Sequence, residues 1–516
     1  MNRFVEKYGN DVTGILRGFD RLVFRGTARA LAVRDRLDWF LTDQHVLLKD
    51  WDRYVHKMTE QLKKASCGEA LRLGRPVRYL GSTKLSKEDV ARAIAKRDGI
   101  TKGLICVLTC VEPCWSFEIQ RNPEKRRLVL VSRQRKCMFL YHYWCDPVFG
   151  FMNARIQTWF PFSIQVCING REWLARTLDR AGVRYERWEN CFPWIEDVAA
   201  AQRLMDVQLR TAWPDTLRDI ARRLNPAHEE MFAPAKVSYY WSVYQDEWAT
   251  DVMFRSPKAL AAIYPKLMRG ALIAFGSEDV MRFLGRKPHG RFQGQVITSL
   301  LKRPEGVRIK HQVGENSIKA YDKFCQIFRV ENTMNNPRDF KVYRPKEGGP
   351  KKTLAWRPLR RGVADIHRRA DVQQAANERY LDALASLDTD RSVKEVVTPV
   401  CRPTRWKHQR VRALRPWSEP DQPLLHIISR GEFILNGFRN RDILAHLYPD
   451  ELSPSQQRQK AAARITRLLR LLRAHGLIRK VPHTHRYLLT PKGREITSAV
   501  IQLYNVPLTR VAEVAA

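Results

Sequence analysis

The stretch RITRLLRLLRAHGLIRKVPHTHRYLLTPKGR, residues 464–494, gives the clearest indication of a fold in this chain. At about 100° per residue, the apolar and the basic side chains of 455–475 gather on opposite arcs of a helix. The apolar arc holds Ala461, Ile465, Leu468, Leu469 and Leu472, and the basic arc holds Lys460, Arg464, Arg467, Arg470 and Arg473. Gly476 is a typical helix end, and LIRK and RYLLT, joined by VPHTH, predict two short strands before a closing helix at PKGREITSAVIQLY.

The residues before this helix, PLLHIISRGEFILNGFRNRDILAHLYP, can supply two further helices. Three helices and a β-hairpin over about residues 421–505, under a fifth of the chain, resemble the winged helix-turn-helix superfamily. The resemblance implies a recognition helix in the major groove of DNA and a wing on the backbone or the minor groove. A module of this kind can alternatively bind protein or dimerise. The DNA contacts that the resemblance implies are Gln456, Lys460, Arg464, Arg467 and Arg470 on the helix, and His483, His485 and Arg486 on the wing.

The charge balance of the whole chain favours a nucleic acid as partner. Lysine and arginine number 91 against 54 acidic residues, which gives a net charge of +37. Excess charge on this scale opposes compaction, and a polyanion neutralises it. The N-terminus lacks the apolar run of a signal peptide, and no stretch approaches the roughly 18 apolar residues of a spanning helix. We therefore expect a cytoplasmic or nucleoid-associated protein that binds DNA or RNA and no membrane; a homodimer stays open.

The composition predicts a folded α+β chain of several parts. Hydrophobic residues make up 44% and aromatic residues 10%, as is typical of globular proteins, and 516 residues exceed one ordinary core. The expected parts are 1–190, an α+β domain with an antiparallel sheet; 191–389, a second α+β domain; 390–420, a basic linker; and 421–516, the winged helix. Within the first part we expect short strands around Gly18 and Gly26, several strands over 103–168, and a helix ending at Gly182; a long helical region follows from Trp194 to Asn225.

Two basic segments outside the tail are further candidates for nucleic-acid contact. Residues 390–420 contain four prolines and predict an extended connector. As an arm along a phosphate backbone, this segment would use Arg405 and Lys407, with Trp406 stacked on a base. The second segment, PKEGGPKKTLAWRPLRRG, would follow the backbone of a structured RNA. It offers Lys351, Lys352, Arg360 and Arg361.

The ten cysteines are expected to stay reduced, because no export signal precedes them. Cys106, Cys110 and Cys114 are spaced as small apolar groups on one side of a strand, and no CxxC pair occurs.

Catalytic chemistry is expected only from scattered acids. The chain lacks the signatures of P-loop ATPases, GxSxG hydrolases, zincins and base deaminases. Cleavage or joining of a phosphodiester commonly needs carboxylates that converge on Mg²⁺ or Mn²⁺. The candidate acids are Asp20, Asp146, Asp251, Asp322 and Glu331. Each could instead be a salt-bridge partner in so basic a chain.

Asp322 and Glu331 are the favoured metal ligands. If IKAYDK and QIFRVEN are neighbouring strands with a tight turn at Phe324 and Cys325, Asp322 could face Glu331. Tyr321 or His311 could then serve as nucleophile or base. The pattern K-x-Y-[DE]-K…R-x-E resembles strands of plasmid rolling-circle replication initiators over about a dozen residues. The tyrosine segment of that family is lacking, so its mechanism is not carried over.

Three classes of function follow from these patterns. The first is a DNA-processing enzyme of mobile-element type: a metal-dependent nuclease, a transposase or a replication-initiator-like protein. The second is a non-catalytic DNA-binding regulator. The third is an RNA-binding protein that clasps a structured RNA.

Overall fold

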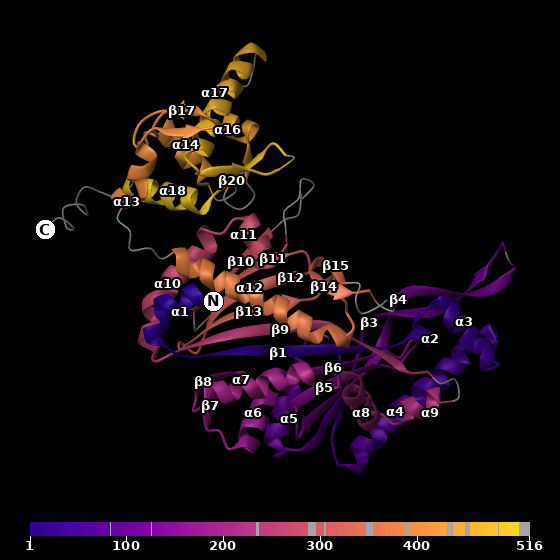
Figure 1. Cartoon of the computed structure of the whole chain (residues 1–516). Coiled ribbons are helices and arrows are strands. Elements are labelled where there is room, and N and C mark those ends of the chain that lie inside the picture. The colour runs from indigo at the N-terminus through magenta and orange to yellow at the C-terminus, as the bar shows by residue number, and fades with distance from the viewer. Residues whose placement is uncertain are drawn as a thin grey trace. The chain divides into compact units, whose positions relative to one another are not determined.

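The computed structural model combines helices with mostly antiparallel sheets, which confirms the α+β class (Figure 1). It describes the chain except at residues 83, 125, 234–236, 287–295, 304–305, 347–353, 388–392, 431–432, 434–436, 449–454, 483 and 505–516. The described residues form two compact units. Unit 1 consists of Met1–Thr13, Val252–Asn332 and Ala375–Ala516, and unit 2 of Gly14–Asp251 and Thr333–Gln374. No helix in these described ranges is long and apolar enough to cross a membrane.

Unit 2 is built on a sheet whose neighbouring strands are β9-β1-β6-β5-β4-β3-β2. The strands are β1 (Val12–Ala28), β2 (Val77–Tyr79), β3 (Gly103–Asn122), β4 (Arg127–Asp146), β5 (Gly150–Gln157), β6 (Ile164–Asn169) and β9 (Tyr239–Phe254). β2 pairs with β3 in parallel, whereas the β3–β4, β4–β5, β5–β6 and β6–β1 pairs are antiparallel.

The expectation of two short strands around Gly18 and Gly26 was wrong, because both glycines lie inside the single strand β1. A Cβ at Gly26 would come within 2.7 Å of the Ile164 side chain, and one at Gly18 within 2.3 Å of Met205. These glycines therefore mark places where neighbouring side chains approach the strand closely, and not turns.

Helices pack on the sheet of unit 2. They include α2 (Arg29–Ala32), α3 (Arg34–Asp43), α4 (Trp51–Arg72), α5 (Lys87–Arg97), α6 (Gly170–Ala181), α7 (Val198–Asp206), α8 (Trp213–Leu224) and α9 (Ala227–Phe232). α6 ends at Gly182, as predicted, in the left-handed conformation with φ of 68°. The expected long helix over 194–225 was wrong at its start, because β8 (Cys191–Ile195) pairs with β7 (Tyr185–Trp188) there. A buried core forms around Phe24 and Trp213, whose rings lie 4.4 Å apart.

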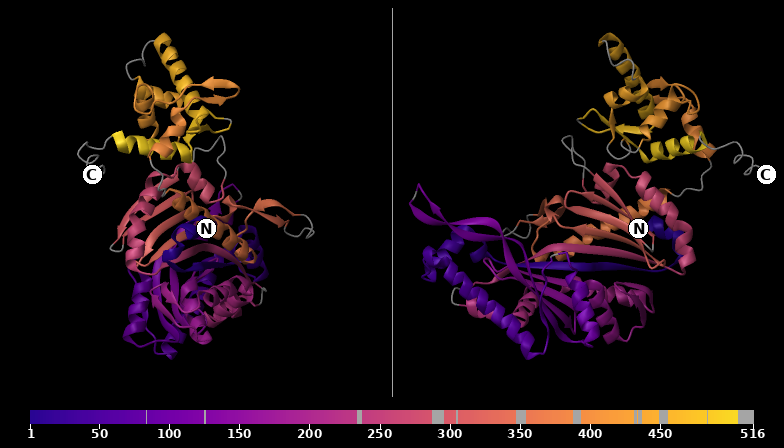
Figure 2. Two further views of the ribbon diagram at one scale, coloured as in Figure 1. Left: turned by 60° about the vertical axis from the view of Figure 1, so that its left-hand side comes forward. Right: turned by 180° about the vertical axis from the view of Figure 1, so that it is seen from behind.

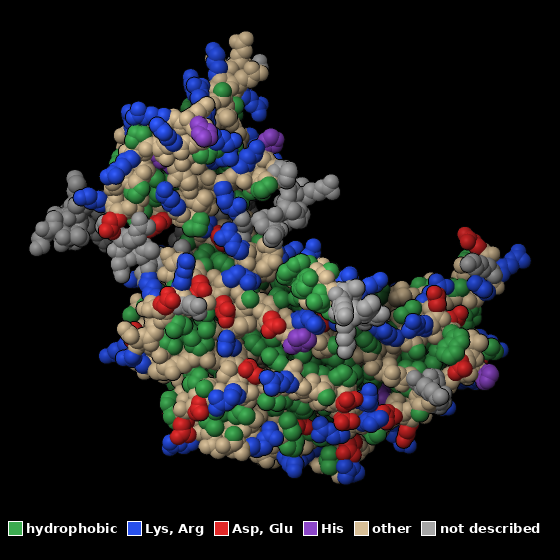
Figure 3. Space-filling view, viewed as in Figure 1, with side chains coloured by type: hydrophobic (Ala, Val, Ile, Leu, Met, Phe, Trp, Pro, Cys, Tyr) green, Lys and Arg blue, Asp and Glu red, His purple; other side chains and the backbone are tan. Residues whose placement is uncertain are grey.

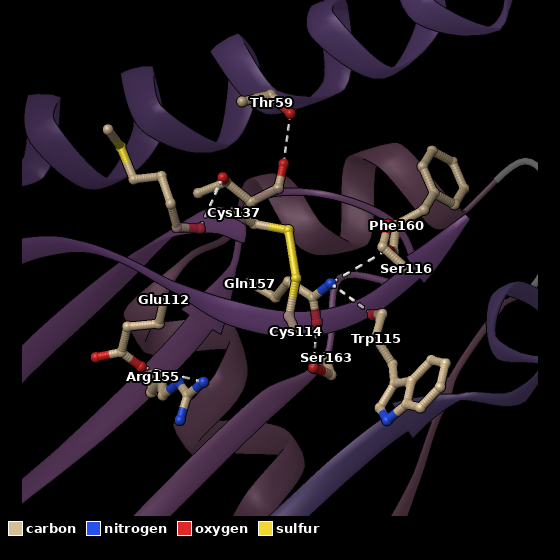
Figure 4. Close-up of a disulfide and its surroundings, with 12 residues drawn as sticks. Thr59, Glu112, Cys114, Trp115, Ser116, Cys137, Arg155, Gln157, Phe160 and Ser163 are labelled. Carbon is tan, nitrogen blue, oxygen red and sulfur yellow. Dashed lines mark hydrogen bonds and ion pairs between the residues drawn. A yellow bond between two sulfur atoms is a disulfide. The ribbon is translucent and has the colours of Figure 1, made fainter. Parts of the chain in front are cut away.

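Cys114 and Cys137 form a disulfide between β3 and β4, so the expectation that all cysteines stay reduced was wrong at this pair (Figure 4). Cys114 lies opposite Arg135 in the register, one diagonal step from Cys137, where cross-strand side chains meet. Beside the disulfide, the Gln157 amide donates to the carbonyl oxygens of Trp115, at 3.2 Å, and Phe160, at 3.1 Å. These bonds hold the segment after β5 against the base of the long β3–β4 hairpin.

Unit 1 contains the neighbouring strands β10 (Val296–Arg303), β11 (Gly306–Val313), β12 (Asn316–Lys323) and β13 (Ile327–Met334). α1 (Asn2–Tyr8), α10 (Pro257–Ile273), α11 (Ser277–Phe283) and the C-terminal half of α12 (Ile366–Leu387) belong to the same unit. Phe328 of β13 contacts Phe4 of α1 and Tyr264 of α10, and His311 of β11 contacts Tyr380 of α12. These helices therefore cover one face of β11 and β13. A separate hairpin in unit 2 consists of β14 (Lys341–Pro345) and β15 (Leu354–Pro358).

The C-terminal part of unit 1 has its own apolar core. Its elements are α13 (Val393–Val397), β16 (Thr404–Trp406), β17 (Gln409–Val411), α14 (Asp421–Ile428), β18 (Phe438–Arg439), α16 (Asn440–Leu447), α17 (Ser455–Ala474), β19 (Ile478–Lys480), β20 (Arg486–Leu489) and α18 (Pro491–Tyr504). The short strands form a sheet in the order β18-β20-β19.

The segment 390–420 differs from the extended linker that its composition predicts. Thr404–Trp406 and Gln409–Val411 pair as a hairpin, with Lys407 and His408 at positive φ in its turn. Val400 and Leu414 are buried in the same core as α14 and α17. Apolar residues on either side of the hairpin thus anchor it to the C-terminal part.

Candidate nucleic-acid interface

Helix α17 separates apolar and basic side chains as its sequence predicts. Ala461, Ile465, Leu468, Leu469 and Leu472 are all buried in the C-terminal core. On the other side Gln456, Lys460, Arg464, Arg467 and Arg470 are exposed, and Arg473 is half-buried. The twenty residues of this helix include six basic and no acidic ones. Its exposed side therefore carries positive charge without an acidic residue of the same helix to offset it.

The β16–β17 hairpin lies against the C-terminal half of α17. The guanidinium carbon of Arg473 lies 5.0 Å from the centre of the Trp406 ring and that of Arg470 5.7 Å, while the Lys407 ammonium lies 5.3 Å away. Arg470 also donates a hydrogen bond to the Gln409 side chain. Trp406, predicted to stack on a base, thus contacts cations of its own chain.

A buried carboxylate fixes the segment that follows this hairpin. The Arg412 guanidinium donates to both oxygens of Asp421 at 2.6 and 2.7 Å, and Asp421 is fully buried. The Arg415 amide adds a third bond to Asp421 at 2.8 Å, and His475 Nε2 lies 2.8 Å from the Arg412 carbonyl oxygen. Sequence reasoning missed Asp421 and Gln409, and the residues WKHQR contain no alternation of apolar and polar side chains that would have predicted the hairpin.

The other predicted contact residues lie in several settings. His485 is exposed and Arg486 half-buried in the β19–β20 hairpin, where burial and then Arg439 lower the pKa of Arg486. In unit 2, Arg361 is exposed, whereas Arg360 donates to the buried Asp365 at 2.9 and 3.0 Å. Arg405 of β16 is exposed. His483, Lys351 and Lys352 lie outside the described residues.

Lysine and arginine side chains are numerous over the surface of the C-terminal part (Figure 3). In this view few acidic side chains lie among them.

The candidate acids of unit 2 do not converge. Asp20 accepts two bonds from the Asn190 amide, at 2.8 and 2.9 Å. Asp146 accepts from the backbone amides of Val148 and Phe149 and pairs with Arg223 at 3.0 Å. Each of these acids therefore has a structural role at its own place in the fold.

Asp251 forms a buried ion pair with Arg171 of α6, with 3.1 Å between Arg171 Nη2 and Asp251 Oδ2. The two side chains are 0% and 2% exposed. Arg171 also donates to the Ala249 carbonyl oxygen at 3.3 Å. The pair thus connects α6 to β9 inside unit 2.

Asp322 and Glu331 lie on opposite faces of their strands, so the expected facing pair was wrong. Glu331 accepts from the Lys319 ammonium and the Tyr321 hydroxyl, each at 2.6 Å. Because side chains alternate along a strand, Asp322 points to the face opposite to its neighbour Tyr321. The backbone amide of Asp322 donates to the Tyr264 hydroxyl oxygen of α10 at 3.3 Å. Within the described ranges, no group of three or more histidine, cysteine or acidic side chains could hold a metal ion.

The electrostatics of Glu331 are those of a compensated buried charge. Burial acts to raise its pKa, but the charges of Lys319 and Arg329 together with the hydrogen bonds to Glu331 outweigh burial, and the pKa is lowered. The hydrogen bonds from Lys319 and Tyr321 act in the same direction.

No known protein family, curated protein or solved structure matches this chain.

Proposed function

We propose that this chain binds duplex DNA through the exposed side of α17, with its C-terminal part acting as a winged helix. The order α14, β18, α16, α17, β19 and β20 is the order of helices and strands in that superfamily, with α17 in the place of the recognition helix. The observation that carries the proposal is the division of α17 into a buried apolar side and an exposed side with basic and no acidic residues.

The dimensions of α17 suit this role. A helix of 20 residues is about 30 Å long, and the major groove of B-DNA is about 12 Å wide, enough to admit a helix. The N-terminal half would bring Gln456 and Lys460 to base edges, and Arg464 and Arg467 to phosphates beside the groove. Arg470, Arg473 and the β16–β17 hairpin would then follow the phosphate backbone at the other end of the helix.

The proposal is tested with the double variant Arg464→Ala, Arg467→Ala in the full chain. We expect weaker binding to duplex DNA, and a slope of log K against log salt that is smaller in magnitude by about 2, because two phosphate contacts are lost. Both side chains are exposed, so the melting temperature should not change. The measurement is fluorescence anisotropy with a labelled duplex over a series of salt concentrations.

The matched control removes two exposed arginines of unit 2, Arg53 and Arg203, whose side chains are 84% and 71% exposed. This control changes the net charge by the same amount. Equal loss of affinity in both variants would mean that total charge, and not α17, sets binding. Unchanged affinity and slope in the α17 variant would overturn the proposal.

A further inference from the structure

We propose that the face of strands β10–β12 opposite to the helices of unit 1 is a second binding surface, for single-stranded nucleic acid. Residues directly opposite each other in antiparallel strands share a face. The registers Leu301↔Arg308, Ser299↔Lys310 and Lys310↔Lys319 therefore place alternate residues of three strands on one side. We call this side the basic sheet face; its charged members are Arg303, Arg308, Lys310, Lys319 and Lys323.

Side-chain contacts support this assignment independently of the register. The Arg303 guanidinium carbon of β10 lies 5.8 Å from the centre of the Tyr321 ring of β12. Tyr321 and Lys319 both reach Glu331 of β13. These contacts join side chains from three strands on the same side of the sheet.

The opposite face is the one that helices cover. It holds His311, whose Nε2 lies 3.1 Å from the Tyr380 hydroxyl oxygen of α12, and Phe328, which contacts α1 and α10. In the reverse view of Figure 2 (right), none of these helices lies in front of β10–β13. Ile297 and Leu301 of β10, on the basic sheet face, are 55% and 46% exposed.

The charged side chains that β10, β11 and β12 contribute to the basic sheet face are all positive. Asp322 is the single acidic residue in β10, β11 and β12, and it lies on the helix-covered side. Glu331 of β13 is on the basic side, but only 2% of it is exposed, and it lies beneath Lys319 and Tyr321. Glu331 thus positions a lysine and a tyrosine and presents little negative charge to a ligand.

The mixture of side chains favours an unpaired strand as the occupant. Cations on β10, β11 and β12 can follow a phosphate backbone, while the exposed Ile297 and Leu301 can contact the faces of bases. In a duplex those base faces are stacked inside and out of reach of the side chains of a sheet, whereas a single strand can splay its bases onto a sheet. The inference goes beyond α17, because it concerns another surface and another form of nucleic acid.

The test is the double variant Arg303→Ala, Lys310→Ala in the full chain, with labelled single-stranded DNA, single-stranded RNA and duplex DNA as separate probes. We expect at least tenfold weaker binding of the single strands and a salt slope smaller in magnitude by about 1.4, at about 0.7 per phosphate contact. Duplex binding should stay that of the wild type. The two single-stranded probes distinguish DNA from RNA as the preferred strand.

Lys302 and Lys258 provide the matched control. Lys302 is exposed on the same strand but points to the other side, and Lys258 is exposed at the start of α10. Lys258→Ala, Lys302→Ala should leave single-strand binding unchanged. Equal effects of the two double variants, or a loss of duplex binding alone, would overturn the inference.

A second variant keeps the test decisive if Lys310→Ala lowers the melting temperature. Arg303→Glu changes one exposed side chain at the end of the edge strand β10, and it should weaken single-strand binding while the protein still melts as the wild type does. The α17 variant gives the converse pattern, with duplex binding lost and single-strand binding kept. Failure of one proposal is therefore distinguishable from failure of the other.

Discussion

The Lys319 ammonium lies 2.6 Å from the Glu331 carboxylate, and the two side chains are 16% and 2% exposed. Glu331 is thus an internal counter-ion of a lysine on a basic surface. The Glu331 carboxylate accepts from this lysine with one oxygen and from the Tyr321 hydroxyl with the other.

Removing this counter-ion should destabilise the fold. Glu331→Ala leaves Lys319 and the buried Arg329 beside an empty site, so we expect the free energy of unfolding to fall by about 3–5 kcal/mol. Urea unfolding followed by tryptophan fluorescence measures the change. As a control, Glu88→Ala removes an acid from an exposed pair with Arg92 and should cost less than about 1 kcal/mol. A Glu331→Ala variant as stable as the wild type would contradict the assigned role.

The Asp251–Arg171 pair should likewise be structural. Asp251→Ala leaves the fully buried guanidinium of Arg171 without this carboxylate. We therefore expect the free energy of unfolding to fall by about 3–5 kcal/mol. Asp215→Ala, which removes an acid 70% exposed beside Arg218, is the matched control and should change stability by less than about 1 kcal/mol. If Asp251→Ala folds with wild-type stability, the pair does not connect α6 to β9 as described.

Local sequence patterns predicted the helices and strands of this chain better than the contacts between them. The periodicity of 455–475 is contained in one helix, and the C-cap at Gly182 needs only the residues beside it. The partners of the candidate acids are far away in the sequence: Asn190 for Asp20, and Arg171 for Asp251. A single sequence contains no local signal for pairings that tertiary structure alone brings together.

One additional residue in the loop between β12 and β13 decides whether Asp322 and Glu331 lie on the same face of the sheet. The expected tight turn contained Phe324 and Cys325, but three residues, 324–326, separate β12 from β13. A shift of one position between paired strands moves a side chain to the other face. The sequence predicted both strands, whereas the pairing of their side chains depended on a loop length that strand propensity does not determine.

The buried His228 should make unit 2 sensitive to acid. Its Nδ1 lies 2.7 Å from the Tyr239 hydroxyl, which donates to the Phe162 carbonyl oxygen at 3.0 Å. Burial lowers the pKa of His228 from 6.5 to about 3, with a smaller contribution from His142. Below about pH 6.5, His228 binds a proton in the unfolded chain but not in the folded one, so protonation favours the unfolded chain. Above that pH, His228 does not lower the free energy of unfolding in this way. The free energy of unfolding therefore decreases as the pH falls from 6.5 towards 3.

At pH 5.5, one unit below the ordinary pKa, this histidine should cost about 1.4 kcal/mol of stability. His228→Phe cannot titrate, so its free energy of unfolding should fall less steeply between pH 6.5 and 4.5 than that of the wild type. Urea unfolding across this pH range measures the difference, and the exposed His426→Gln serves as control. Parallel curves for the wild type and His228→Phe would contradict the prediction.

Trp406 should contribute to duplex binding by holding the arginines of α17 in place. Its ring lies under Arg470 and Arg473, so Trp406→Ala frees both side chains without changing the charge. One exposed cation–π contact contributes about 0.5–1 kcal/mol, which corresponds to a two- to fivefold loss of affinity for a labelled duplex. The slope of log K against log salt should stay that of the wild type, because no phosphate contact is removed. Trp417→Ala, which removes an indole 45% exposed in the same segment, is the matched control and should bind as the wild type does. Equal affinities of the two variants would mean that the indole of Trp406 does not position these arginines for DNA.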